Sequence, residues 1–168
     1  MNTHNRYYFD KLYPFQDEVL AKVHDQLTGF YLSGGTALSR CYLNHRYSDD
    51  LDFFVNHDEL FKKHCDRILD GLKTLPCNLE ILTASHDFLR LLLSKGNVKL
   101  KIDFVNDVQA RFGDVKNMEV FGRTDSWRNI LSNKICAVSR MEAKDIVDLL
   151  FLADAYDFSW EQIIKEAF

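Results

Sequence analysis

Three aspartates, Asp50, Asp52 and Asp103, are the residues best suited to carry chemistry in this sequence. Asp50 and Asp52 lie in an apolar segment that predicts a strand over 50–55, and residues two apart on a strand point to the same face. Two neighbouring carboxylates repel each other and resist burial, so a compensating cation is expected. Carboxylate oxygens are ligands that Mg²⁺ and Mn²⁺ prefer. We therefore expect a site for one of these ions, with a solvated, Asp-rich strand edge as the alternative.

Asp103 lies near the end of a second predicted strand, 98–105, in which apolar residues alternate with polar ones. If this strand lies beside the one that carries Asp50 and Asp52, three carboxylates converge. Three convergent carboxylates can hold two metal ions for the in-line transfer of a phosphoryl group. The alternative for Asp103 is an ordinary exposed aspartate that faces a lysine across the sheet.

A glycine pair, Gly34-Gly35, stands between an expected strand and an expected helix. Glycines let a backbone approach a phosphate closely, and the N-terminus of the following helix offers free N–H groups. Ser33 and Thr36 add hydroxyl groups on either side. A Gly-Gly pair alone is usually a turn, and its weight here comes from the aspartate strand that follows one short helix later.

Four further residues are candidates for binding a nucleotide. Lys134 projects from a predicted helix and could hold phosphates, although a surface lysine would look the same. Asp145 begins another helix, where a role in the site competes with a simple stabilising interaction with the helix dipole. Arg46 and Ser48 precede the aspartate strand, and either phosphate binding or bracing of the loop would explain them.

These residues need a scaffold of strands and helices, which the apolar periodicity predicts. The order indicates an α+β fold, a mixed β-sheet flanked by helices with a short C-terminal helical region. We expect a single domain over 1–168, with the sheet over about 30–105 and the C-terminal helices over about 127–168. Residues 106–126 show no regular pattern. Helices are expected over 15–27, 36–43, 58–72, 127–139, 142–156 and from 159, where Ser159 and Gln162 form a capping box, and strands over 30–32, 50–55, 79–82, 88–94 and 98–105.

Composition narrows the class of protein. The 168 residues are 46% hydrophobic and 27% charged, which is typical of a globular protein. The net charge of −4 argues against a purely electrostatic nucleic-acid binder. The four cysteines form no CxxC pair, and neither a membrane-length apolar run nor a signal-peptide layout is visible. We therefore expect a cytoplasmic protein that does not bind membranes.

The motifs carry a family resemblance. Gly34-Gly35, then Asp50-x-Asp52, then an aspartate on a later strand is similar to the pattern of the nucleotidyltransferase superfamily typified by DNA polymerase β. The strings Gly-Gly-Thr-Ala-Leu, from residue 34, and His-Arg-x-Ser-x-Asp-Leu-Asp-Phe-Phe, from residue 45, resemble its AbiEii/AbiGii toxin branch. A later segment resembles the branch signature Lys-x-x-Ala…Arg…Lys-Asp-x-x-Asp-Leu, from Lys134 to Leu149. The resemblance covers about residues 30–152.

This resemblance implies a Mg²⁺- or Mn²⁺-dependent nucleotidyltransferase that transfers a nucleotide from an NTP to an acceptor hydroxyl. In that interpretation Asp50, Asp52 and Asp103 hold the metals, while Gly34 and Gly35 bind phosphates. It also implies a toxin of a toxin–antitoxin or phage-abortive system, with an RNA such as tRNA as acceptor and a cognate antitoxin as partner. The alternatives are transfer to a protein side chain and an inactive nucleotidyltransferase-like binding module. Under this interpretation the remaining nucleotide contacts come from Ser33, Thr36, Arg46, Ser48, Lys134 and Asp145.

Overall fold

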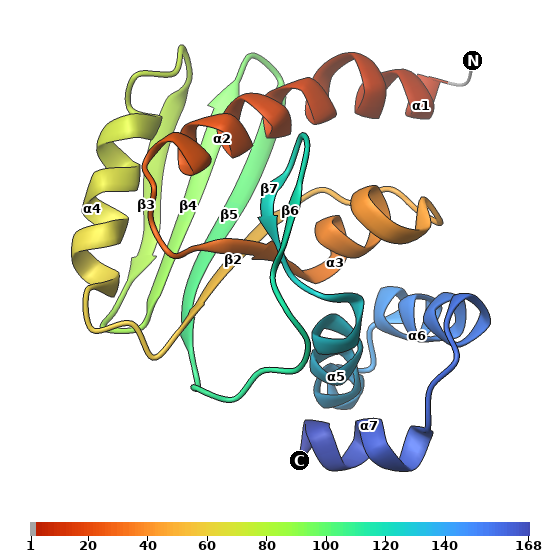
Figure 1. Ribbon diagram of the computed structural model, residues 1–168. Coiled ribbons are helices and arrows are strands. Elements are labelled where there is room, and N and C mark those ends of the chain that lie inside the picture. Colours follow the sequence, from red (N-terminus) through yellow and green to blue (C-terminus); the bar gives the residue numbers. More distant parts are fainter. Residues whose placement is uncertain (1–2) are drawn as a thin grey trace.

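The computed structural model describes residues 3–168 and contains one mixed sheet of seven strands (Figure 1). The strand order is β3-β4-β5-β2-β1-β7-β6. The pairs β2/β5 and β1/β7 are parallel and the other four neighbouring pairs are antiparallel. The strands are β1 Tyr31–Ser33, β2 Leu51–Asn56, β3 Asn78–Ala84, β4 Phe88–Lys95, β5 Val98–Asp107, β6 Lys116–Met118 and β7 Gly122–Thr124.

Helices cover one face of this sheet and gather at one end of it. In Figure 1, α2 and α4 lie against the sheet, whereas α5, α6 and α7 group together on the side of α3. This arrangement confirms the expected α+β class; the single-domain organisation stays a prediction. The helices are α1 Thr3–Tyr7, η1 Tyr8–Leu12, α2 Tyr13–Asp25, α3 Gly34–Thr36, η2 Ala37–Leu43, α4 Phe61–Leu72, α5 Trp127–Ala137, η3 Val138–Arg140, α6 Ala143–Ala155 and α7 Trp160–Ala167.

The two faces of the central strands have different chemistry because side chains alternate along a strand. The apolar side chains of β2, β4 and β5 point to one face, where they are buried in the core with side chains of α2 and α4. The polar side chains point to the opposite face. The buried set on these strands is Leu51, Phe53, Val55, Leu89, Leu91, Leu93, Val98, Leu100, Ile102 and Phe104.

The register of the sheet fixes which polar side chains become neighbours. Asp52 of β2 is paired with Asp103 of β5, and Asp103 is paired in turn with Arg90 of β4. On the other side of β2, Asp52 is paired with Ser33 of β1. Four strands therefore bring Ser33, Asp52, Asp103 and Arg90 into one row across the sheet.

The structure corrects the sequence-based boundaries in three places. A helical segment over residues 3–12 precedes α2, which begins at Tyr13 and ends at Asp25. The stretch expected to be irregular contains β6 and β7. Asp58 does not cap α4 directly, since α4 begins at Phe61 and the Asp58 carboxylate accepts from the backbone N–H of Leu60 (2.9 Å).

The C-terminal helices follow the prediction closely. Ser126 caps α5 by accepting from the backbone N–H of Asn129, and Ser159 caps α7 by accepting from that of Gln162. A tight turn at Gly96 joins β4 and β5 into a hairpin. Across residues 3–168, no helix has both the length and the apolar character needed to span a bilayer.

Candidate active site

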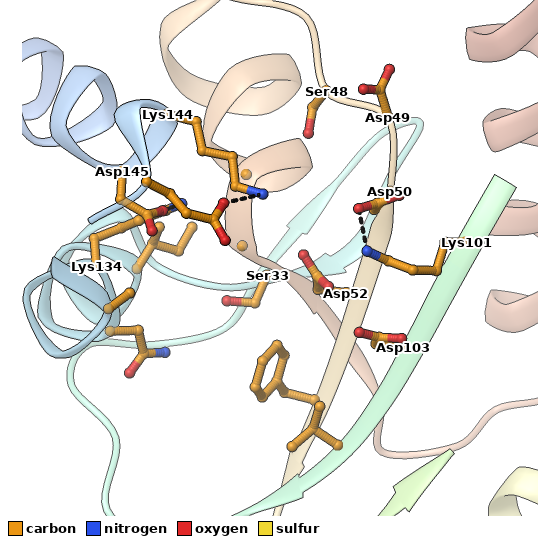
Figure 2. Close-up of a pocket in the computed structure, with 18 of the residues that line it drawn as sticks. Ser33, Ser48, Asp49, Asp50, Asp52, Lys101, Asp103, Lys134, Lys144 and Asp145 are labelled. Carbon is orange, nitrogen blue, oxygen red and sulfur yellow. Dashed lines mark hydrogen bonds and ion pairs between the residues drawn. The ribbon is translucent and has the colours of Figure 1, made fainter. Parts of the chain in front are cut away.

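A polar cavity of about 580 Å³ opens on the aspartate-bearing face of the sheet. Figure 2 shows the three aspartates along two neighbouring strands, with Lys134, Lys144 and Asp145 across the cavity. Every sequence-predicted site residue except Thr36 lines it. The cavity therefore joins the sheet to the C-terminal helices, which contribute its cationic side.

Asp52 lies at the centre of the acidic group and has no counter-charge of its own. Within residues 3–168, its carboxylate makes no hydrogen bond or ion pair. Burial, followed by the negative charges of Asp103 and Asp50, raises the pKa of Asp52 to about 6. The carboxylates of this group repel one another, and a hard divalent cation bound among them would relieve the repulsion.

The other two carboxylates are paired with basic side chains. Asp50 Oδ2 lies 2.6 Å from Lys101 Nζ, and Asp103 accepts two hydrogen bonds from Arg90, at 2.8 and 2.7 Å. In the described part of the chain, no three His, Cys, Asp or Glu side chains lie in a group that could hold a metal ion as they stand. Asp50 and Asp103 would first have to exchange these basic partners for the metal.

The glycine pair lies against the acidic group. Gly34 begins α3 with a φ of +66°, and a Cβ built on it would collide with Asp52 Oδ2. A Cβ on Gly35 would lie 2.6 Å from Arg46 Nη2 and 3.2 Å from Ser48 Oγ. Only residues without side chains leave the space between this backbone and Asp52 open for a ligand.

Gly34→Ala should therefore disturb the site, whereas Gly96→Ala serves as a matched control. Both glycines have a positive φ, which costs an alanine about 1–2 kcal/mol. No atom lies within 4 Å of a Cβ on Gly96, so that variant carries the backbone strain alone. We expect Gly34→Ala to lose more stability than Gly96→Ala in urea unfolding and to lose nucleotide binding as well. Equal losses of stability, with binding kept, would contradict the close approach of Gly34 to Asp52.

The hydroxyl groups beside the glycines differ in position. The Ser33 hydroxyl donates to Asp125 Oδ2 at 2.7 Å while its residue lines the cavity. Thr36 corrects the prediction, because it is fully buried and its hydroxyl is hydrogen-bonded to Ser48 Oγ (2.8 Å) and to the backbone carbonyl of Asp50. Thr36 thus fixes the loop that leads into β2 and does not face a ligand.

Asp148 of α6 is a buried centre of ion pairs. Its carboxylate accepts from Arg46 Nε (2.6 Å) and Nη2 (2.8 Å), and it lies 2.7 Å from His45 Nε2 and 2.8 Å from Lys134 Nζ. Burial would raise the pKa of Asp148, but the hydrogen bonds from Arg46 and Lys134 outweigh it and lower the pKa to about 2. This cluster joins α6 to the loop before β2, so Arg46 braces that loop while also lining the cavity.

Lys134 and Asp145 face each other inside the cavity. Lys134 Nζ lies 2.6 Å from Asp145 Oδ1, and both side chains are largely buried. Arg140 lines the cavity but does not pair with Asp145 or Asp148, because Lys134 and Arg46 occupy those carboxylates. The structure therefore makes Lys134 the central cation of this side of the cavity.

Several residues around the site were not predicted. Gln16 is fully buried in α2 and its side-chain amide donates to the backbone carbonyls of Ser48 and Asp49, both at 3.1 Å. Asp125 is fully buried and holds Ser33 and Arg111. The sequence around Gln16 and Asp125 does not indicate these contacts, because each contact joins segments that are distant in the chain. A signal did exist for Lys101, which stands two residues before Asp103 on the same strand face.

Comparisons with known proteins identify a family and related folds. A family model described as "Nucleotidyl transferase AbiEii toxin, Type IV TA system" matches residues 19–168. No curated protein matches the sequence. Among solved structures, the chain resembles JHP933 from Helicobacter pylori (TM-score 0.67, 24% identity, 86% of this chain and 66% of that one). It also resembles a candidate nucleotidyltransferase from H. pylori (TM-score 0.68, 24% identity, 85% and 67%). The chain thus spans about two thirds of the length of these two proteins, and they share its fold.

Proposed function

The chain belongs to the AbiEii nucleotidyl transferase toxin family of type IV toxin–antitoxin systems, and we propose that it transfers a nucleotide from an NTP to a hydroxyl group of an RNA such as tRNA. The observation that carries the proposal is the register of the sheet. It places Asp52 directly beside Asp103, and Gly34 lies against Asp52. A group of carboxylates beside a backbone segment without side chains suits a nucleotide whose phosphates are bound together with divalent cations.

Asp50, Asp52 and Asp103 would hold Mg²⁺ or Mn²⁺, which would neutralise charge on the reacting phosphates and lower the pKa of the attacking hydroxyl. Gly34 and Gly35 would accommodate the β- and γ-phosphates, with Ser33 beside them. Asp103, on the strand farther from the glycines, would lie nearest the acceptor hydroxyl. These groups act by positioning the reactants and by neutralising charge.

The cations of the C-terminal helices would complete the nucleotide site. Lys134 is held by Asp145 and Asp148, so its ammonium group has a fixed place in the cavity. A fixed cation contributes more to a transition state than a mobile one, because it needs no reorganisation during the reaction. Arg46, Ser48 and Asp145 line the same cavity and would contact the bound nucleotide or fix its immediate surroundings.

A labelling experiment tests the reaction and its acceptor. Purified protein is incubated with Mg²⁺ and each of the four α-³²P-labelled NTPs, once with total RNA and once with total protein. We expect label in the RNA with at least one NTP. Label only in protein would replace the RNA acceptor by a side-chain hydroxyl, and label in neither would favour an inactive binding module. The family also implies a cognate antitoxin, which should relieve growth arrest when it is expressed with this chain.

Binding can be tested separately from transfer. Any ligand that binds only the native state raises the melting temperature by mass action. We expect Mg²⁺ or Mn²⁺ together with an NTP to raise Tm more than the sum of either alone, because the cation removes repulsion among the carboxylates. The measurement is a thermal-shift titration at fixed ionic strength. An unchanged Tm with saturating Mg²⁺ and every NTP would count against the proposed site.

A further inference from the structure

The cavity has a second basic side that the nucleotide does not account for. Arg90 and Lys101 lie on β4 and β5, on the same sheet face as the aspartates, and both line the cavity. They are the partners of Asp103 and Asp50 described above. Lys134 lies on the other side of the three carboxylates (Figure 2). The glycines follow β1, which pairs with β2 on the side away from β5. The acidic group is thus flanked by cations on two opposite sides.

In-line transfer assigns different substrates to these two sides. The attacking and leaving oxygens lie on opposite sides of the reacting phosphorus. If the leaving pyrophosphate is bound at Gly34 and Gly35, the acceptor must approach from the side of β4 and β5. Arg90 and Lys101 are then the cations that an incoming acceptor meets first.

Arg90 and Lys101 are also accessible enough to change partners. Their side chains are 39% and 37% exposed, and the Lys101–Asp50 pair is of the exposed kind that contributes little. Arg90 holds Asp103 with two hydrogen bonds, so its release depends on the competing charge of the cation. A divalent cation at Asp50 and Asp103 would compete directly with them. Once released, an Arg fork and a Lys ammonium are well suited to phosphate oxygens.

We propose that Arg90 and Lys101 exchange partners: they neutralise Asp103 and Asp50 in the metal-free protein and bind the phosphates of the acceptor strand when a divalent cation occupies those carboxylates. This inference rests on the proposed function, and it names the acceptor's recognition element as the phosphodiester backbone of single-stranded RNA. The exchange makes acceptor binding depend on the metal, because Arg90 and Lys101 remain paired with Asp103 and Asp50 in the metal-free protein.

The exchange predicts that a divalent cation strengthens RNA binding through Arg90 and Lys101 in particular. Divalent cations normally weaken the binding of a protein to RNA because they compete for the phosphates. Here Mn²⁺ should strengthen it. The experiment measures the Kd of a 5′-fluorescein-labelled 12-nucleotide single-stranded RNA by fluorescence anisotropy, without NTP, with and without Mn²⁺ at constant ionic strength. We expect Mn²⁺ to lower the Kd of the parental protein at least about fivefold, because Arg90 and Lys101 gain charge-assisted contacts to phosphates.

Two variants and a matched control separate the exchange from general charge effects. Arg90→Gln and Lys101→Gln should each lose most of the Mn²⁺-dependent tightening. Lys99→Gln removes an exposed lysine two residues from Lys101 on the same strand face, without an ion pair among residues 3–168, and should keep the full tightening. Tightening that is equal in all four proteins, or Mn²⁺-induced weakening in the parental protein, would overturn the proposal.

A second readout does not involve RNA. Without metal, Lys101→Gln should lower Tm because Asp50 loses its counter-charge, and Mn²⁺ should then raise Tm by more than in the parental protein because no lysine has to be displaced. Lys99→Gln should match the parental protein in both respects. An equal Mn²⁺ shift in Lys101→Gln and the parental protein would contradict the exchange. If the labelling experiment fails while these effects appear, the error lies in the proposed reaction; if label is transferred without them, the error lies in the exchange.

Discussion

Asp52→Asn should reduce nucleotide transfer by about 10³-fold or more while the protein stays folded, as is typical when a main electrostatic element of a phosphoryl-transfer site is lost. The central carboxylate would be shared by both metal ions, so its charge cannot be replaced by a neighbour. Asparagine is nearly isosteric with aspartate, and Leu51 and Phe53 remain in the core on the other face of β2. The measurement is the rate of labelled transfer to RNA at saturating NTP.

The same variant should be more stable than the parental protein, but only above a certain pH. Burial and the charges of Asp103 and Asp50 raise the pKa of Asp52 to about 6, above its unfolded value of 3.8. Ionised Asp52 therefore destabilises the native state, and this cost grows as the pH rises from about 4 to 6. We expect Asp52→Asn to have the higher Tm at pH 8 in the absence of metal, and the difference to vanish below pH 4.

The Asp52→Asn test has one control variant and two outcomes that would contradict it. Asp114→Asn makes the same chemical change at an exposed position outside the cavity and should alter neither transfer nor the pH dependence of Tm. An Asp52→Asn protein that unfolds without metal would make Asp52 a structural residue. One that transfers nucleotide at the parental rate would rule out Asp52 as a catalytic residue.

Asp148→Ala should cause the largest loss of stability of any single site substitution, about 3–5 kcal/mol, because removing one member of a buried ion-pair cluster leaves buried charge uncompensated. Arg46 would lose its carboxylate partner, Lys134 would keep only Asp145, and α6 would lose its main polar attachment to the loop before β2. The free energy of unfolding is measured by urea denaturation without metal. Asp154→Ala, an exposed position on the same helix, is the matched control and should change stability little.

Lowering the pH should reduce the stability of the parental protein partly by protonating Asp148. The folded pKa of Asp148, about 2, lies below the unfolded value of 3.8. A lowered pKa stabilises the native state above the unfolded pKa, and this contribution is lost as the pH falls from about 4 to 2. We expect the slope of stability against pH between 4 and 2 to be smaller in Asp148→Asn than in the parental protein. Equal slopes would show that the cluster does not contribute to acid stability.

The acidic centre was predictable because it depends on a local rule. The spacing of Asp50 and Asp52 and the alternation around Asp103 follow from strand geometry, which the sequence displays directly. The basic partners depend on how strands pair. Arg90 faces Asp103 through the register of the β4–β5 hairpin, whereas Lys101 reaches Asp50 only because β5 lies beside β2, and that order is not encoded in any single segment.

The same limit explains the remaining corrections. The burial of Asp148 could not be inferred from its own helix, because it depends on Arg46, 102 positions earlier in the chain. Strands β6 and β7 were missed because each has three residues, too few to display alternation. Thr36 was assigned to the ligand on its residue type, yet its hydroxyl is occupied by the loop that it follows in space.

The ion pair between Arg46 and Asp148 also has a consequence for the timing of synthesis. A ribosome makes the loop that carries Arg46 long before it makes α6, and Ser33 likewise waits 92 residues for Asp125. Contacts of such long sequence separation form late in folding, because closing a long loop costs entropy before any contact repays it. The loop before β2, which lines the cavity, therefore gains its attachment to α6 only after most of the chain has been synthesised.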